Sequence, residues 1–288
     1  MIMNILLRAL LICSMLFAGP LVLAESGQTE KTQIEIVQAE TAQAVLAALA
    51  LSDIIEVMRQ EGLAQAVDVT GGFLPSTAAV AWRRDLDAIY DVNWMKATVA
   101  THFASELGDA DMSDVLAFLT STNGKRLVAL EVSARQAMSD ASIEDAARSV
   151  YRASGDASDA RRDSVATFIS RNDMVAANVE SALHASFSYY RGLRESGALE
   201  MSDREIIEEV WATEAETRSD TSEWLHAFLW MAYAPLDNSV LAEYSALSAT
   251  GAGQQMNKAL FASFDQMFAE IFYALGLTTG QALQTQNL

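Results

Sequence analysis

The 288-residue sequence contains little cysteine, proline, histidine or lysine. The single cysteine, Cys13, has no second cysteine in the chain with which to form a disulfide. Three prolines and few stretches of alternating apolar and polar residues favour helices over strands. Acidic residues outnumber basic ones by 38 to 19, which gives a formal charge of −19. This balance argues against a nucleic-acid partner, because phosphate binding depends on clustered positive charge.

Residues 1–24 have the features of a secretory signal peptide. Arg8 provides a positive start, an apolar core follows, and Val22 and Ala24 occupy the positions that a signal peptidase reads. The sequence therefore predicts cleavage before Glu25 and export to the periplasm of a Gram-negative bacterium. The alternative is an uncleaved membrane anchor, which is disfavoured because the apolar run is short and ends at a cleavage site.

Processing at this position would remove Arg8 and Cys13. It would leave 18 basic side chains, one fewer than in the whole chain, against the same 38 acidic ones. A chain without thiols must rely on its apolar core for stability, and this chain is long enough to bury one. No later apolar run has the length of a membrane span, so we expect no transmembrane anchor after cleavage.

Long stretches of helix-forming residues predict an all-α, multi-helix bundle. The stretch 160–196 has the clearest apolar stripe and predicts one rod of about 55 Å, which we expect to be a long central helix. Residues 25–36 are polar and predict a flexible leader, and residues 276–288 are expected to form a tail. The other predicted helices span residues 38–66, 78–107, 111–121, 124–153, 202–233, 237–249 and 252–275.

A weak internal repeat relates two predicted helical halves, residues 37–156 and 157–275. A shift of 129 residues places Gly124 on Gly253 without a gap. In both halves a helix is expected to end at a Ser or Thr that precedes this glycine by three residues. Since a hydroxyl caps a helix end and glycine lets two backbones approach closely, we predict one tight helix corner in each half. The predicted structural corner residues are Phe118, Ser121, Gly124 and Leu127 in the first half and Thr250, Gly253 and Met256 in the second.

The first corner resembles DUF2059, a family of exported bacterial helical proteins of unknown function. The recurrent element of this family has the form Phe-Tyr-x-(Thr/Ser)-x-x-Gly-x-(Lys/Arg)-Leu. Leu119 stands where the family has tyrosine, and the second copy is more degenerate. The resemblance implies an all-α exported protein and assigns no catalytic residue. The matching residues are Phe118, Ser121, Gly124, Arg126 and Leu127.

The three histidines each have a glutamate at helical spacing. Glu223 precedes His226 by three residues, which is the Glu-x-x-His spacing of di-iron bundles, whereas His102 and His184 have a glutamate four residues away. A di-iron site needs a second Glu-x-x-His, which the sequence lacks, and pairs of this kind arise by chance in an acidic, helix-rich chain. We therefore predict no cofactor, no metal and no catalytic residues, and Glu223 and His226 are the candidates if a metal binds.

The sequence also lacks two other catalytic patterns, a complete phosphate loop and a nucleophile elbow. Residues 251–253, Gly-Ala-Gly, lack the third glycine and the following Lys-Ser or Lys-Thr of a phosphate loop. A Gly-x-Ser-x-Gly elbow is also missing from the sequence, and three histidines offer few bases for a catalytic triad. A hydrolase or a metal-dependent enzyme is therefore the least favoured class.

The last predicted helix has an apolar face that is broad enough to exceed what one neighbour covers. Core packing is the first explanation, and an apolar ligand cavity or a partner surface is the other. We therefore expect a non-enzymatic periplasmic protein that binds or scaffolds an unknown protein partner. The alternative is a helical carrier of a small apolar ligand such as a lipid. The apolar face of the last predicted helix contains Phe261, Phe264, Met267, Phe268, Ile271, Phe272 and Leu275.

Overall fold

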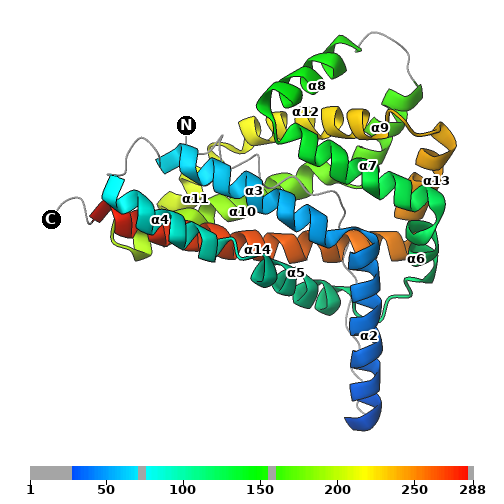
Figure 1. The fold of residues 1–288 in the computed structure, drawn as a ribbon, viewed down its shortest axis with the longest axis horizontal. Helices are drawn as coiled ribbons and strands as arrows, with labels where there is room; N and C mark the ends of the chain where they lie inside the picture. Colours follow the sequence, from blue (N-terminus) through cyan, green and yellow to red (C-terminus); the bar gives the residue numbers. More distant parts are fainter. Residues whose placement is uncertain (1–27, 71–75, 155–159, 285–288) are drawn as a thin grey trace.

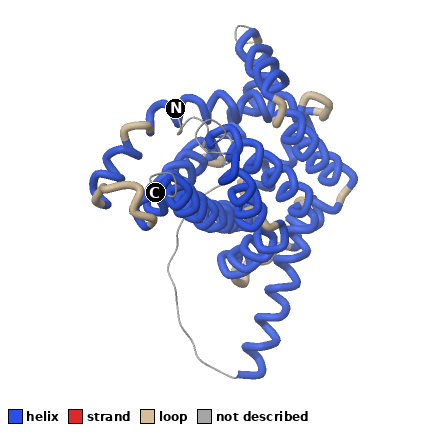
Figure 2. Tube along the Cα trace, turned by 60° about the vertical axis from the view of Figure 1, so that its left-hand side comes forward, coloured by secondary structure: helices blue, strands red, loops and turns tan. Residues whose placement is uncertain are grey.

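The computed structural model describes residues 28–70, 76–154 and 160–284. These residues form helices joined by turns and short connections, and no strand occurs among them (Figures 1 and 2). The predicted all-α, multi-helix fold is therefore confirmed. The predicted signal peptide, residues 1–24, lies outside the described residues. The helices are α2 (Gln28–Ala48), α3 (Leu51–Thr70), α4 (Ser76–Ile89), α5 (Val92–Leu107), α6 (Ser113–Thr120), α7 (Thr122–Met138), α8 (Ala141–Ala153), α9 (Ala160–Arg171), α10 (Met174–Glu195), α11 (Asp203–Trp211), α12 (Glu214–Tyr233), α13 (Asn238–Ser248) and α14 (Gly251–Gln284).

Helix α14 runs through the middle of the molecule and is the helix around which the others pack (Figure 1). It has its most extensive contact with α10, and α5 also packs along it. The broad apolar face predicted for this segment is buried, with Phe264, Met267 and Phe268 at most 3% exposed. The long central helix of the molecule is therefore α14 and not the segment 160–196.

The predicted rod over residues 160–196 is two helices, α9 and α10. They are separated at Asn172 and Asp173, and Asp173 has a left-handed backbone with φ of 44°. Asn and Asp adopt this conformation more readily than other residues with a side chain, so they end a helix without glycine or proline. The prediction of one rod is wrong for this reason. Four further predicted helices are also divided, at positions 49–50, 90–91, 139–140 and 212–213.

Glycines bring α10 and α14 into close contact. A Cβ on Gly192 would collide with the backbone of α14, and a Cβ on Gly276 would collide with the backbone of α10. Gly280 continues this contact at the end of α10. Because packing persists beyond residue 275, α14 remains helical to Gln284, and the prediction of a tail is wrong for residues 276–284.

Residues 28–36 of the predicted flexible leader, 25–36, belong to α2. The first part of this helix projects away from the other helices (Figure 1). Further along α2, Val45 and Leu46 are buried in the core. A helix that is anchored in this way extends at little cost through preceding residues that lack proline and glycine.

Most of the buried apolar side chains form one continuous cluster, which extends from Ala42 in α2 to Leu275 in α14. It takes residues from both predicted halves, 37–156 and 157–275, so the described parts of the two halves share one core. The stacked rings of Phe118 and Tyr244, with centroids 5.6 Å apart, are one contact between them.

None of the described helices is long and apolar enough by itself to cross a bilayer. The pair formed by Val37–Ala48 and Leu51–Ala66 meets the length and composition requirement together, with a bend of 63° between its two parts.

Candidate functional site

The two predicted helix corners have the same local geometry. At the first corner, the Ser121 hydroxyl accepts a hydrogen bond from the backbone N–H of Gly124 at 3.0 Å. At the second, the Thr250 hydroxyl accepts one from the backbone N–H of Gly253 at 3.1 Å. The helices that follow, α7 and α14, begin at residues 122 and 251, which are 129 positions apart.

Both corner glycines lie directly against the preceding helix. A Cβ on Gly124 would collide with the carbonyl oxygen of Phe118, and a Cβ on Gly253 would collide with that of Leu247. The following corner residues, Leu127 and Met256, are buried in the core. These residues fix the angle at which α7 and α14 leave their corners, and both helices then contribute to a cavity.

This cavity has a volume of about 110 Å³ and lies among α2, α3, α7, α12, α13 and α14. Its walls are mainly apolar. Two residues singled out in the sequence line it, the corner residue Met256 and Phe264 from the broad apolar face of α14. Other apolar wall residues are Leu46, Leu49, Met58, Val132, Phe228 and Leu260.

The cavity wall contains two charged residues, Arg135 and Glu131. It also contains the polar Asn257 and the tyrosine Tyr244. The Arg135 guanidinium donates two hydrogen bonds to the carboxylate of Glu61, at 3.0 and 2.5 Å. It also lies over the ring of Trp224, 5.2 Å from the centroid. The positive charge of Arg135 is therefore balanced by Glu61.

Glu131 is half-buried in the cavity wall. Its Oε1 atom accepts a hydrogen bond from the Tyr233 hydroxyl at 2.5 Å, and no cation pairs with its carboxyl group among the described residues. Burial raises the pKa of Glu131 to about 7, and the hydrogen bond from Tyr233 opposes this rise only in part. The group therefore changes charge near neutral pH.

Aromatic side chains hold Tyr233 and Tyr244 beside the cavity. The ring of Phe168 lies 6.3 Å from that of Tyr233 in an edge-on arrangement and 5.1 Å from that of Tyr244. Phe118 also stacks on Tyr244. The first helix corner thus supports the cavity wall through Phe118, although it does not line the cavity itself.

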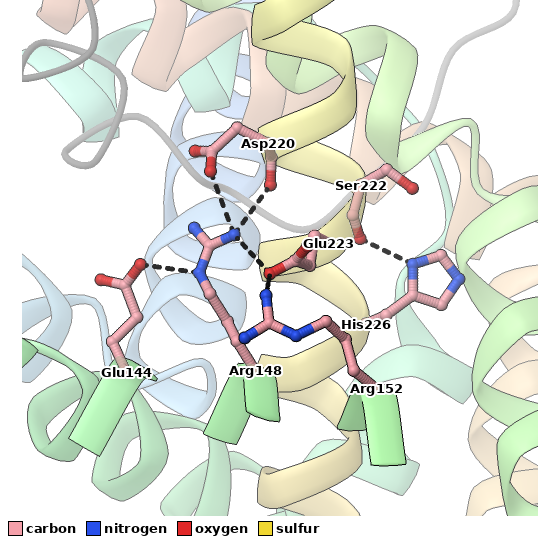
Figure 3. A network of polar contacts seen from close by, with 7 residues as sticks. All are labelled: Glu144, Arg148, Arg152, Asp220, Ser222, Glu223 and His226. Carbon is pink, nitrogen blue, oxygen red and sulfur yellow. Dashed lines mark hydrogen bonds and ion pairs between the residues drawn. The ribbon is translucent and has the colours of Figure 1, made fainter. Parts of the chain in front are cut away.

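The two metal candidates, Glu223 and His226, are engaged with other partners (Figure 3). The Glu223 carboxylate accepts hydrogen bonds from Arg148 at 3.4 Å and from Arg152 at 2.8 Å. His226 Nδ1 lies 2.7 Å from the carbonyl oxygen of Ser222. Among the described residues, no group of three or more His, Cys, Asp or Glu side chains could hold a metal ion.

The other two histidines also lie apart from the cavity. His184 Nδ1 is 2.8 Å from Asp265 Oδ2, and this hydrogen bond raises the pKa of His184 despite the opposing effect of burial. His102 is half-buried on α5. The structure therefore does not bring the three histidines together around one point.

Sequence reasoning missed Glu131 and Tyr233. One signal was available, since Glu131 is an acid between Leu130 and Val132 in an otherwise apolar stretch. Helical spacing would have paired Glu131 with Arg135, four residues later, as a surface ion pair. The structure pairs Arg135 with Glu61 instead, and this leaves Glu131 in the cavity wall without a cation.

Comparison with known proteins identifies one segment. Residues 93–152 match the model of a family described as "Uncharacterized protein conserved in bacteria (DUF2059)". The predicted resemblance is confirmed for this segment, which contains the first helix corner. A second copy around Gly253 stays a prediction. No curated protein and no solved structure matches the chain.

Proposed function

We propose, on the premise that residues 93–152 are a DUF2059 segment, that this chain is a non-enzymatic exported protein that binds a small apolar ligand. The cavity among α2, α3, α7 and α12–α14 carries this proposal, because its walls are mainly apolar and contain only a few polar groups. Such pockets are the usual sites for small molecules in helical proteins. The placement in the periplasm is also part of the proposal and rests on the sequence of residues 1–24.

The volume of the cavity limits the ligand. An apolar cavity of roughly 150 Å³ holds one benzene ring, and this cavity measures about 110 Å³. The ligand is therefore a molecule of a few carbon atoms, or the end of a longer apolar chain. A complete lipid does not fit inside.

Native mass spectrometry of the protein purified after export tests this proposal. We expect a species whose added mass corresponds to one small organic molecule. Leu49→Trp is the matched variant, because Leu49 lies in the cavity wall at the turn between α2 and α3, where a larger side chain fills space with little disturbance of a helix. The added mass should disappear in this variant. A wild-type protein that never carries or takes up an apolar molecule would contradict the proposal.

Scaffolding by self-association is a second candidate function, and one surface favours it. Trp211 and Ile207 on α11 are 62% and 44% exposed. They border an apolar groove between α10 and α11 that also contains Leu183 and Phe187. One surface thus presents both protruding apolar side chains and a hollow that receives such side chains, as a symmetric contact between two copies requires.

Sedimentation velocity over a range of concentrations distinguishes this second candidate. Self-association through the groove predicts a dimer that Trp211→Ser dissociates. Ile143→Ser is the control, since Ile143 is an exposed apolar residue on α8, outside the groove. A monomer at all concentrations would exclude scaffolding by self-association and leave the ligand-binding proposal unchanged.

A further inference from the structure

Glu131 has no ion-pair partner among the described residues, whereas other buried or half-buried glutamates do. Glu61 is paired with Arg135, Glu144 with Arg148, and Glu223 with both Arg148 and Arg152. Glu131 has only a neutral phenol, Tyr233, as its partner among the described residues. A carboxylate in apolar surroundings is costly unless a cation or several hydrogen bonds compensate for the lost water.

The geometry leaves one side of this carboxyl group available. Tyr233 donates to Oε1, and Oε2 has no hydrogen bond among the described residues. Arg135 is one helical turn away on α7, but its guanidinium is held by Glu61 in a neutral pair. Arg135, which lines the same cavity, therefore neither compensates Glu131 nor introduces an uncompensated positive charge there.

We propose that the cavity binds a small molecule with an apolar body and one ammonium group, whose N–H groups donate to the carboxylate of Glu131. This inference rests on the proposed ligand-binding function and specifies the class of ligand. The apolar body lies among Leu46, Val132 and Leu260, and the ammonium group supplies the cation that the protein does not. Hydrogen bonds between two charged groups are shorter and stronger than those between neutral groups.

Two further properties favour a cationic ligand. The formal charge of the chain is −19, so its electrostatic field attracts small cations. Glu131 is half-buried in the cavity wall, and burial raises the pKa of its carboxyl group to about 7. An ammonium that pairs with this carboxylate therefore compensates for the hydration that burial reduces.

Isothermal titration calorimetry with n-pentylamine and 1-pentanol tests the inference in the exported protein, purified and freed of ligand. The two probes have the same apolar chain and differ in charge. The titration is done at pH 8.5, which is above the pKa of Glu131 and below that of an alkylammonium, roughly 10 as in lysine. We expect n-pentylamine to bind about tenfold more tightly than 1-pentanol.

Glu131→Gln is the matched variant, because glutamine has the same shape and still accepts a hydrogen bond from Tyr233. We expect this variant to bind both probes with similar affinity. Equal affinities in the wild-type protein, or a preference for the amine that persists in Glu131→Gln, would overturn the inference and leave the cavity as an apolar site. Failure of both probes to bind would contradict the proposed function itself. The comparison of two probes in the wild-type protein does not depend on the folding of any variant.

Discussion

At the scale of single residues, burial changes the proton affinity of Glu131. Desolvation is the main cause that raises the pKa of its carboxyl group from the ordinary 4.5 to about 7. In the unfolded chain the group titrates near its ordinary value, so the folded state binds the proton more tightly between these two pH values. The free energy of unfolding therefore decreases as the pH rises through this range.

We predict that Glu131→Gln weakens this pH dependence. The shift corresponds to at most about 3 kcal/mol between pH 4.5 and pH 8, and the amide cannot lose a proton in this range. Urea unfolding at pH 5 and pH 8 measures the difference for each protein. Glu56→Gln, at an exposed glutamate on α3, is the control and should retain the full dependence of the wild type. Parallel pH dependences in wild type and Glu131→Gln would show that the carboxyl group is not desolvated.

A second prediction concerns two arginines on α8 that share a network but differ in burial (Figure 3). The Arg148 side chain is 9% exposed beside the buried Glu144, whereas that of Arg152 is 60% exposed. Arg148→Met leaves the Glu144 carboxylate buried without its cation and should cost about 3–5 kcal/mol of stability. Arg152→Met should cost less than about 1 kcal/mol. Urea unfolding of both variants checks this, and equal losses would mean that burial does not govern the network.

Sequence spacing predicted residue pairs poorly. It placed Glu223 beside His226, but Glu223 pairs with arginines from α8, which lies about 70 positions earlier in the chain. Helical spacing would also pair Glu131 with Arg135, one turn later, whereas the structure pairs Arg135 with Glu61. Local spacing shows which side chains can meet on one helix, whereas buried charges take the partner that tertiary packing brings closest.

At the scale of helices and corners, the two glycines at position 124 and position 253 have equivalent surroundings. Each lies against a carbonyl oxygen of the preceding helix and donates its N–H to a Ser or Thr hydroxyl. Hydroxyl capping and the small size of glycine are both local properties, so the sequence was sufficient to predict them.

We predict that Gly253→Val destabilises the protein by about 1–3 kcal/mol, because the added carbon atoms have no space beside Leu247. Gly251→Val is the matched control, since it lies two residues earlier on the same helix with no atom within 4 Å of its Cβ position. Thermal unfolding should show a lower midpoint for the first variant and little change for the second. The same midpoint in both would contradict the close approach at this corner.

Helix breaks were less predictable than helices. Apolar periodicity identified the helical segments, but it continued across breaks such as Asn172-Asp173, because the residues on both sides face the same core. Such breaks depend on a left-handed backbone or on a capping side chain such as Asp140 at the start of α8, and not on proline or glycine. Conversely, α14 continues beyond the predicted end at residue 275 because Gly276 and Gly280 pack against α10.

At the scale of the whole molecule, the sequence predicted the all-α class but not the organisation of the core. The stretch 160–196 has the most regular apolar stripe, whereas α14 occupies the centre. A helix lies at the centre when other helices surround it, and the apolar period of its own sequence does not show how many helices pack against it. The cavity was also beyond sequence reasoning, since its walls come from six helices between α2 and α14.

Export is the prediction that concerns the complete chain. We expect the processed protein to begin at Glu25, because Val22 and Ala24 match the requirements of a signal peptidase. Intact-mass measurement of the protein from the periplasmic fraction checks this. A species that retains Met1 and fractionates with membranes would favour the uncleaved anchor instead.

The central claim is that the space among these six helices is a binding cavity, and diffraction from crystals under xenon pressure tests it most directly. Xenon enters apolar cavities and leaves a strong, localised signal. We predict a xenon site between Leu46, Val132 and Leu260 in the wild-type protein and its loss in Leu49→Trp. Crystals of the wild type that take up xenon elsewhere, with none at this position, would contradict the claim.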